Sequence, residues 1–211
     1  MILTKTLRHF DRGSGEEELG QYKSTEEVFC GSGACLLVKK SCVRDLLLNS
    51  NEVDEGMYKI YPQLKFERDK RSQLFDEAFF AYREDADLAW RSQLYGWSCV
   101  YVPNARAYHR RVVLPTNRRS LPVELNRYSV RNRFLLQINN FSYSQSPMAL
   151  WRGMVWRNLL VVFGVLVKER TSFPALLDVF MLLKRAFVRR KIILNKAKEH
   201  QGIGRMKKWF N

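Results

Sequence analysis

Apolar and polar residues alternate in short blocks before residue 113, which favours strands and short helices there. The run VFCGSGACLLVKK at residues 28–40 predicts a buried strand that small residues interrupt. The run WSCVYVP at residues 97–103 alternates weakly and ends in proline, so it predicts a second strand. Residues 104–112, NARAYHRRV, can form a further short strand.

Two short helices are predicted in the same part of the chain. One extends from Ser41, a residue type suited to an N-cap, to about Leu48. The other begins near Glu84 and ends at Gly96, because glycine accommodates the left-handed backbone that follows many helices. Residues 49–73 are charged and show no clear period, so they predict a loop or a surface insertion.

Helical periodicity dominates after residue 120. Residues 121–139, 148–167 and 175–199 predict helices, the last two apolar on one side and rich in Lys and Arg on the other. Pro174 separates these two. The longest apolar run, residues 158–167, is shorter than the roughly 20 residues needed to cross a bilayer, so it does not predict a membrane-spanning helix.

Charge is distributed unevenly along this pattern. Residues 1–109 hold 15 Lys/Arg and 17 Asp/Glu, a net charge of −2, whereas residues 110–211 hold 21 Lys/Arg and 4 Asp/Glu, a net charge of +17. Such asymmetry indicates that the basic half meets a polyanion, either nucleic acid or an anionic membrane surface. A hydrophobic content of 46% over 211 residues supports a folded core and excludes a wholly disordered chain.

Cysteine and N-terminal patterns add two expectations. The four cysteines form no CxxC pair and have no histidine at zinc-site spacing, so we expect free thiols in a reducing cytosol. The N-terminal residues include no apolar segment of the signal-peptide kind. We divide the chain into a polar loop (residues 1–27), a folded α/β region (28–140) and a basic amphipathic helical region (141–211).

The acidic group Glu84-Asp85-Ala86-Asp87 allows two interpretations. Acidic residues in the first turn of a helix favour its dipole, and Asp87 is spaced to pair with Arg91 at i,i+4. Alternatively, the aromatic residues that precede Glu84 form a pocket in which a carboxylate acts as a general base. Local sequence alone favours the first interpretation, because acidic residues are common in the first turn of helices.

Four ordered blocks carry a family resemblance: GSGACLLVKK at 31–40, FDEAFFAYREDADLAWRSQLYGW at 75–97, YVPNARAYH at 101–109 and YSVRNRFLLQ at 128–137. Together they resemble the C-terminal half of a family 2 glycosyltransferase, of the rhamnosyltransferase-like branch that builds surface polysaccharides. The resemblance implies a partial GT-A-like α/β fold with a mixed sheet and flanking helices. It also implies inverting transfer of a sugar from a nucleotide-sugar to a glycan or lipid-linked acceptor.

The resemblance assigns roles to individual residues. Asp85 corresponds to the catalytic base that takes the acceptor proton, and Glu84 beside it to a ligand of acceptor hydroxyls. The small-residue segment lines the sugar and acceptor pocket. Its members are Gly31, Ser32, Gly33 and Ala34. Tyr82 corresponds to an aromatic platform for a sugar ring, with core packing as the alternative, and Arg131 to a phosphate-binding residue, with an exposed helix face as the alternative.

A divalent cation, Mg²⁺ or Mn²⁺, is implied in the same way, with His109 as one ligand and a lone structural histidine as the alternative. The Asp-x-Asp motif that holds this ion lies in the N-terminal half of such enzymes, and nothing before residue 28 matches it. We therefore expect one of three cases: a truncated enzyme, one part of a split enzyme whose partner polypeptide supplies the donor half, or a fragment of a longer protein. A non-catalytic remnant that binds a partner is the alternative.

The basic segments KRAFVRRK (184–191) and RMKKWF (205–210) predict a further partner. Basic amphipathic helices with Trp and Phe are typical of membrane-surface elements, so we expect peripheral binding at the cytoplasmic face of the cell membrane. Packing on the domain is the second interpretation. A nucleic-acid-binding module would also explain the charge, but no RRM, KH or zinc-finger signature is present in the sequence, and we expect no nucleic-acid partner.

Overall fold

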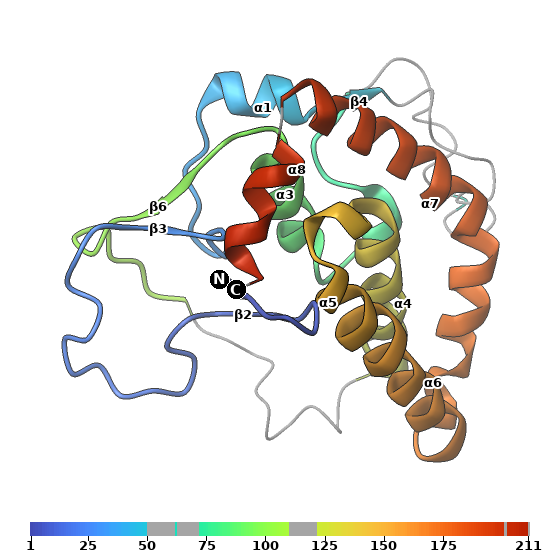
Figure 1. Ribbon diagram of the computed structural model, residues 1–211. Coiled ribbons are helices and arrows are strands. Elements are labelled where there is room, and N and C mark those ends of the chain that lie inside the picture. Colours follow the sequence, from blue (N-terminus) through green and yellow to red (C-terminus); the bar gives the residue numbers. More distant parts are fainter. Residues whose placement is uncertain (50–61, 63–71, 110–121, 201, 211) are drawn as a thin grey trace.

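The computed structural model describes residues 1–49, 62, 72–109, 122–200 and 202–210 (Figure 1). The strands are β1 (Ile2–Leu3), β2 (His9–Phe10), β3 (Glu26–Val28), β4 (Leu48–Asn49), β5 (Ser72–Gln73) and β6 (Cys99–Tyr101). The helices are α1 (Lys40–Leu46), α3 (Glu84–Leu94), α4 (Val123–Asn140), α5 (Pro147–Ala149), α6 (Arg157–Val167), α7 (Phe173–Glu199) and α8 (Gly202–Arg205). Single turns of 3₁₀ helix and one π-helical segment complete the set: Glu77–Phe79, Tyr143–Gln145, Leu150–Trp156, Arg170–Ser172 and Met206–Trp209.

The strands form three separate two-stranded antiparallel sheets, β1–β2, β3–β6 and β4–β5. The fold is therefore mixed α/β, as expected, but the described residues contain no larger mixed sheet. The strand predicted at residues 28–40 is wrong: only residue 28 lies in a strand, and the following residues form a loop. Residues 97–103 contribute the shorter β6, and the described part of the segment 104–112, up to His109, holds no strand.

The helix predicted after residue 84 is confirmed. α3 begins at Glu84, and Gly96 follows its end with φ of +84°, a conformation that glycine adopts without a steric cost. The first short helix, α1, begins at Lys40 rather than after Ser41, and its N-cap residue Lys39 makes no side-chain capping bond. Much of the predicted loop 49–73 falls outside the described residues.

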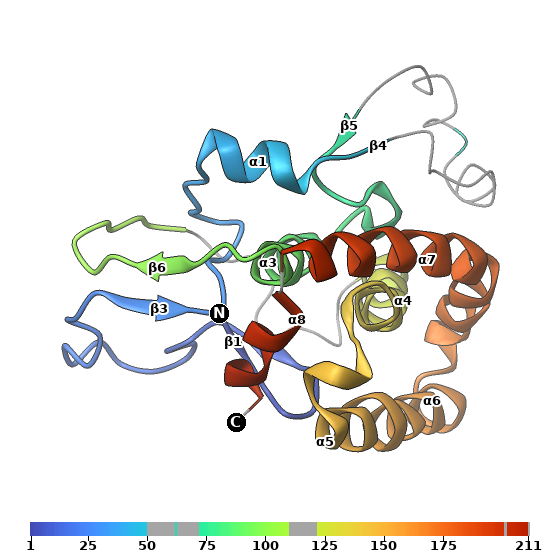
Figure 2. The ribbon, with the colours of Figure 1, turned by 45° about the horizontal axis from the view of Figure 1, so that its top comes forward.

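The long helices form one side of the molecule. α4 lies between α7 and the helix that runs through α5 and α6 (Figure 2). The prediction for 121–139 is confirmed by α4, and that for 175–199 by α7, which begins two residues earlier with Pro174 in its first turn. Proline is accepted there because the first turn of a helix has no intrahelical partners for its N–H groups.

The helix expected at 148–167 is longer than its apolar core suggested. Pro147–Val167 forms a continuous helical segment of 21 residues, joined by the π-helical turns, and its most apolar 18-residue window has a mean hydropathy of 1.4. By length and composition it could cross a membrane, which the run 158–167 alone did not indicate. Only 11% of that window is buried within the protein.

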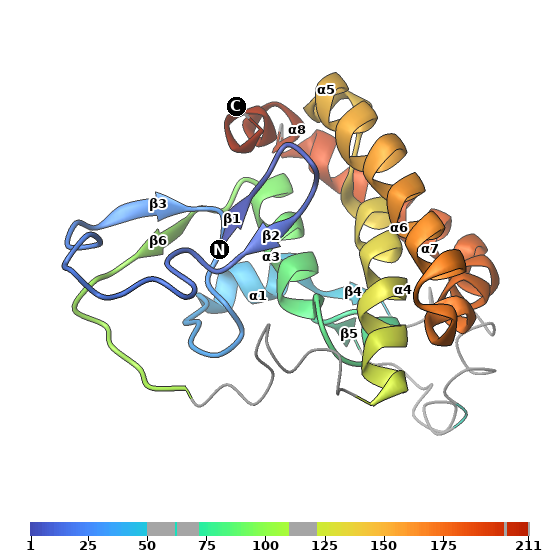
Figure 3. The ribbon, with the colours of Figure 1, turned by 90° about the horizontal axis from the view of Figure 1, so that it is seen from below.

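The core surrounds α3. Trp90 of this helix packs edge-on against Phe29 at a ring-centroid distance of 6.4 Å and against Phe141 at 6.5 Å. Phe210 lies 6.3 Å from Trp90 and closes the cluster from the C-terminal segment. α8 approaches α3 so closely that a Cβ on Gly202 would stand 1.6 Å from the carbonyl oxygen of Leu94, so only glycine fits there. The β3–β6 sheet projects away from the helices (Figure 3).

Candidate functional site

Glu84 and Asp85 occupy the first turn of α3, and both are half-buried. Three of the four residues before them have positive φ: Phe80 at 58°, Tyr82 at 67° and Arg83 at 72°. Positive φ is uncommon for residues with a Cβ and costs free energy at each position. The chain therefore enters α3 through a constrained segment, and the surrounding structure must hold it.

Asn132 of α4 fixes much of this constrained segment by hydrogen bonds. Its Nδ2 atom lies 2.8, 2.7 and 2.8 Å from the carbonyl oxygens of Phe79, Ala81 and Tyr82. Asn132 is fully buried, so these bonds are shielded from water. One amide thus fixes three peptide groups within the four residues 79–82 just before the acidic pair, and so sets where the pair lies.

Arg131 acts on the same segment. It is fully buried, and its Nη2 atom donates to the carbonyl oxygens of Ala78 at 2.5 Å and Phe79 at 3.0 Å. Its Nε donates to Asn132 Oδ1 at 2.9 Å, which orients the neighbouring amide. The guanidinium also lies 5.0 Å from the centre of the Tyr128 ring. Its contacts in this structure are internal, and a phosphate contact by Arg131 stays a prediction.

The small-residue loop reaches the acidic pair. The N–H of Gly33 donates to Asp85 Oδ2 at 3.1 Å, across 52 positions of sequence, and the N–H of Ala86 donates to Oδ1 at 2.7 Å. A Cβ on Gly33 would lie 3.5 Å from the Asp85 Cβ, an ordinary contact, so the fit does not require glycine. Both Asp85 oxygens thus accept backbone hydrogen bonds, which fix the direction of the carboxylate.

Glu84 differs from its neighbour. Its Oε2 atom is buried and has no hydrogen-bond partner among the described residues. Burial raises the pKa of Glu84, the nearby Asp85 charge adds to this, and a hydrogen bond to its own backbone opposes it. A carboxyl group of this kind retains its proton to higher pH and can then donate a hydrogen bond.

The remaining predicted residues are spread around this pair. Ser32 is half-buried and Ala34 exposed in the loop, and Tyr82 is half-buried in the constrained segment. His109 is exposed, and none of its described contacts joins it to the acidic pair. The described residues contain no group of three His, Cys, Asp or Glu side chains suited to a metal ion.

A cavity of about 1400 Å³ lies between the N-terminal segment, the loop after β3, α3 and β6. Gly31 and Ser32 line it, whereas Glu84 and Asp85 lie outside its lining. All four cysteines line it and are free, as the sequence predicted: Cys30, Cys35, Cys42 and Cys99. A hydrogen bond from the Cys30 thiol lowers the pKa of Cys99 to about 6.

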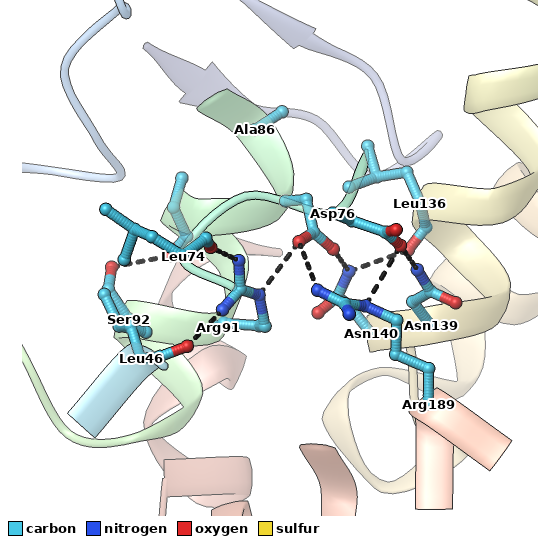
Figure 4. Close-up of polar contacts among 12 residues, drawn as sticks. Leu46, Leu74, Asp76, Ala86, Arg91, Ser92, Leu136, Asn139, Asn140 and Arg189 are labelled. Atoms are coloured by element: carbon cyan, nitrogen blue, oxygen red, sulfur yellow. Dashed lines mark hydrogen bonds and ion pairs between the residues drawn. The ribbon is translucent and has the colours of Figure 1, made fainter. Parts of the chain in front are cut away.

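The sequence did not reveal a buried charge network that surrounds Asp76 (Figure 4). Asp76 contacts Arg185 at 2.6 Å and Arg189 at 3.0 Å, both from α7. Asp87 contacts Arg91 at 2.8 Å, as the i,i+4 spacing predicted. We define these five residues as the paired cluster.

Polar neighbours complete the paired cluster. Asn140 donates to Asp87 Oδ1 at 2.7 Å, and Asn139 donates to Asp76 Oδ2 at 3.2 Å. Burial raises the pKa of Asp76, but the charges of Arg185 and Arg189 outweigh it and hold that pKa well below its usual range. Asp76 therefore stays ionised at neutral pH, and the cluster joins α3 to α4 and α7.

One sequence signal could have indicated the paired cluster. Arg185 and Arg189 stand on the same face of α7 as the buried residues Leu182, Ala186 and Ile193. A charged residue on the apolar face of a helix requires a buried partner of opposite charge. Part of the excess of basic residues in the C-terminal half therefore serves internal pairing.

The chain was compared with protein-family models, curated proteins and solved structures. No protein-family model, no curated protein and no solved structure matches the chain.

Proposed function

We propose that this chain is the acceptor-side portion of an inverting glycosyltransferase that acts in surface-glycan synthesis. The observation that carries the proposal is the convergence of three distant segments on Glu84 and Asp85. The loop 31–34 donates a backbone N–H to Asp85, and α4 fixes the entry to α3 through Asn132. These segments belong to three of the four blocks on which the family resemblance rests.

The chemistry proposed for the pair follows from its geometry. As the acceptor hydroxyl oxygen attacks the anomeric carbon, the bond to the nucleotide diphosphate breaks on the opposite face and the hydroxyl proton moves to Asp85. The two backbone N–H donors hold the Asp85 carboxylate in one orientation for that transfer. Glu84, whose pKa is raised by burial, holds an acceptor hydroxyl by accepting or donating a hydrogen bond.

The divalent cation remains part of the proposal without a step assigned to it. Such an ion would screen the charge of a diphosphate leaving group. His109 is the ligand that the resemblance assigns, and the described residues around it supply no further cluster of ligands. We propose that a separate donor-half polypeptide supplies the remaining ligands and the nucleotide-sugar site.

We further propose that the chain lies on the inner face of the cell membrane through α6 and α7. Large apolar side chains are exposed along the π-helical segment that leads into α6, along α6 itself and along α7: Trp151, Trp156, Leu159, Phe163, Leu166, Phe173, Leu177, Phe180 and Phe187. Basic residues flank them, which favours an anionic surface.

An interfacial position fits the contacts of this helix better than a membrane-spanning one. Asn158 accepts from Arg133 Nε at 2.9 Å and donates to Gln137 at 2.6 Å, so α6 is attached to α4 through its polar side. Crossing a bilayer would break these bonds and bring the neighbouring Arg157 into hydrocarbon, at a cost of several kcal/mol. Lying flat, α6 keeps its polar side on the domain and turns its aromatic side chains to lipid.

The test of transfer uses the purified chain with nucleotide-sugars, Mn²⁺ and an acceptor, alone and with a candidate donor-half polypeptide. We expect turnover that Asp85→Asn abolishes and that Glu124→Gln leaves unchanged. Glu124 is a matched control, because it is also a first-turn acid but lies exposed on α4. Absence of turnover in every pairing, or turnover that survives Asp85→Asn, would leave a non-catalytic, partner-binding remnant as the function.

The proposed binding to the membrane surface has a separate test. Flotation with vesicles that contain anionic lipid should recover the wild-type chain and lose the Trp156→Ser/Phe163→Ser double variant. Both side chains are about 64% exposed, so the variant should retain its folded stability. Equal recovery of the two proteins would overturn the membrane assignment and leave the transferase test untouched.

A further inference from the structure

A second group of cationic side chains lies where β2, α4 and α6 meet. Arg133 of α4 is only 6% exposed, and its Nη2 atom is buried without a hydrogen-bond partner among the described residues. Its Nε donates to Asn158 at 2.9 Å, which fixes the guanidinium in place. Burial, together with the charges of Arg157 and Arg8, lowers the pKa of Arg133 to about 10.

His9 of β2 reaches the preceding turn of α4 through Arg83, whose Nε donates to the carbonyl oxygen of Ser129 at 3.3 Å. Arg83 Nη1 lies 3.5 Å from His9 Nε2, and a guanidinium can only donate, so Nε2 is the acceptor. The ring proton is therefore on Nδ1, and this atom is buried with no hydrogen-bond partner in the described part of the chain. Burial, followed by the charges of Arg83 and Arg133, lowers the pKa of His9 to about 3.

Arg157 of α6 supplies a third donor. Its Nε is buried and has no hydrogen-bond partner among the residues that the structure describes. We define Arg133, Arg157 and His9 as the unpaired cluster. None of the three forms an ion pair with a carboxylate of the described residues, in contrast to the paired cluster, where each arginine meets an aspartate.

We propose that the unpaired cluster binds a phosphate group, as a phosphate monoester or a diphosphate. Three buried N–H donors from β2, α4 and α6 have no acceptor among the described residues, and two of them belong to charged guanidinium groups. Hydrogen bonds tie all three residues to one stretch of α4, since Arg83 links His9 to Ser129 and Asn158, the neighbour of Arg157, accepts from Arg133. A phosphate group carries three strong acceptor oxygens and nearly two negative charges at neutral pH, which matches both the donors and the charge.

The position of the cluster fits two sources of that phosphate. Arg157 belongs to the helix whose outer surface exposes Trp156 and Leu160, so a lipid phosphate could enter with its chain along that surface. Arg83 directly precedes Glu84, so a soluble diphosphate would instead lie on the side of the acidic pair. The proposal requires neither transferase activity nor membrane binding, since it stands on the cluster itself.

The first experiment measures thermal stability against inorganic pyrophosphate in a buffer free of phosphate and sulfate. A ligand that binds only the folded state raises the melting temperature with concentration. We expect this rise in the wild type, and at least tenfold weaker binding in Arg133→Met and Arg157→Met, since each loses a charge-assisted hydrogen bond. Arg152→Met is the matched control, because Arg152 lies on the same helical segment but is exposed.

The direction in which Arg133→Met changes thermal stability distinguishes a binding role of Arg133 from a structural one. Without pyrophosphate, Arg133→Met should be at least as stable as the wild type, because it removes a buried charge that no acid compensates. A purely structural arginine would lower stability in both buffers. Asp85→Asn should keep pyrophosphate binding, so failure of the transferase proposal is distinguishable from failure of this one.

The second experiment distinguishes the sources. Vesicles that carry phosphatidic acid, a phosphate monoester, are compared with vesicles of equal charge that carry phosphatidylglycerol, a diester. A preference for phosphatidic acid that Arg133→Met removes identifies a lipid headgroup, whereas stabilisation by pyrophosphate without that preference identifies a soluble ligand. No stabilisation by pyrophosphate and no lipid preference, or retention of both effects by the two arginine variants, would overturn the proposal.

Discussion

The paired and unpaired clusters use the same residue type in opposite ways. In the paired cluster, Arg185 and Arg189 of α7 meet Asp76 at 2.6 and 3.0 Å. In the unpaired cluster, burial and the nearby charge of Arg157 lower the pKa of Arg133. No carboxylate of the described residues forms an ion pair with either arginine. A net charge of +17 in the second half therefore combines arginines that hold the fold together with arginines that await a ligand.

This difference shows why a charge count does not identify a partner. A buried arginine with an aspartate contributes to the attachment between helices, and removing either partner leaves an uncompensated charge. A buried arginine among other cations lowers stability until an anion arrives. Four predictions, from the largest expected effect to the smallest, test this distinction.

The paired cluster should be costly to break. Asp76→Ala leaves Arg185 and Arg189 buried without their acid, so we expect a loss of about 3–5 kcal/mol in the free energy of unfolding. Urea unfolding followed by tryptophan fluorescence measures it. Glu124→Ala, an exposed acid on α4, should change stability by less than about 0.5 kcal/mol. A loss below about 1 kcal/mol for Asp76→Ala would contradict the pairing.

Two arginines of α4, only two positions apart, should respond in opposite directions. Arg131→Met removes the donors to the carbonyl groups of Ala78 and Phe79, and should cost about 2–3 kcal/mol. Arg133→Met should be neutral or stabilising in a phosphate-free buffer. The same unfolding experiment compares them, and equal losses in the two variants would mean that Arg133 is structural.

Lowering the pH should reduce the free energy of unfolding through both clusters, but in different pH ranges. His9 has a pKa of about 3 in the folded protein and an ordinary value near 6.5 when unfolded. The unfolded chain therefore binds more protons between these values, and stability falls as pH drops from 6.5 to 3, by at most about 1.4 kcal/mol per unit. Asp76, with a lowered pKa, contributes stability above about pH 3.9 and loses it only at lower pH.

The variant His9→Gln isolates the first of these effects. Its free energy of unfolding, measured from pH 7 to 4, should depend less on pH than that of the wild type. Asp76→Asn should keep the wild-type dependence in this range, although its overall stability is lower. Identical pH dependence in the wild type and His9→Gln would show that the histidine is not held neutral by its positive neighbours.

A change in salt concentration should give the smallest difference in stability between the wild type and a variant of the unpaired cluster. Raising KCl from 0.1 to 1 M screens repulsion in the unpaired cluster, so the wild type should gain up to about 1 kcal/mol more than Arg133→Met. General salt effects on burial act on both proteins and cancel in that comparison. An equal gain in both would indicate that Arg133 contributes no net repulsion.

Local periodicity was sufficient for the helices but not for the sheets. α3, α4 and α7 were predicted within a few residues, because α7 has an apolar face at helical spacing and a glycine or proline stands near one end of each helix. The segment 28–40 has the apolar composition of a strand, yet its glycines favour a loop, and Gly33 bonds to α3 instead of a neighbouring strand. Such a tertiary contact leaves no local pattern.

The contacts of the candidate site also divide into those that local spacing predicts and those that it does not. The pairing of Asp87 with Arg91 follows from an i,i+4 spacing, and the structure confirms it. Arg185 lies 109 positions from Asp76, and the members of the unpaired cluster come from three distant elements, so no spacing rule could join them. The meeting of Gly33 with Asp85 was suggested only by the order of the resembling blocks.

The C-terminal segment has a consequence for how the chain is made. Phe210 packs against Trp90 and Phe141, and Trp209 packs against Phe29 at 5.7 Å. Phe29 and Trp90 thus meet the aromatic partners Trp209 and Phe210, which are synthesised more than 100 positions later. Contacts of such long sequence separation fold slowly, and Phe29 and Trp90 stay accessible to chaperones until residue 210 has left the exit tunnel.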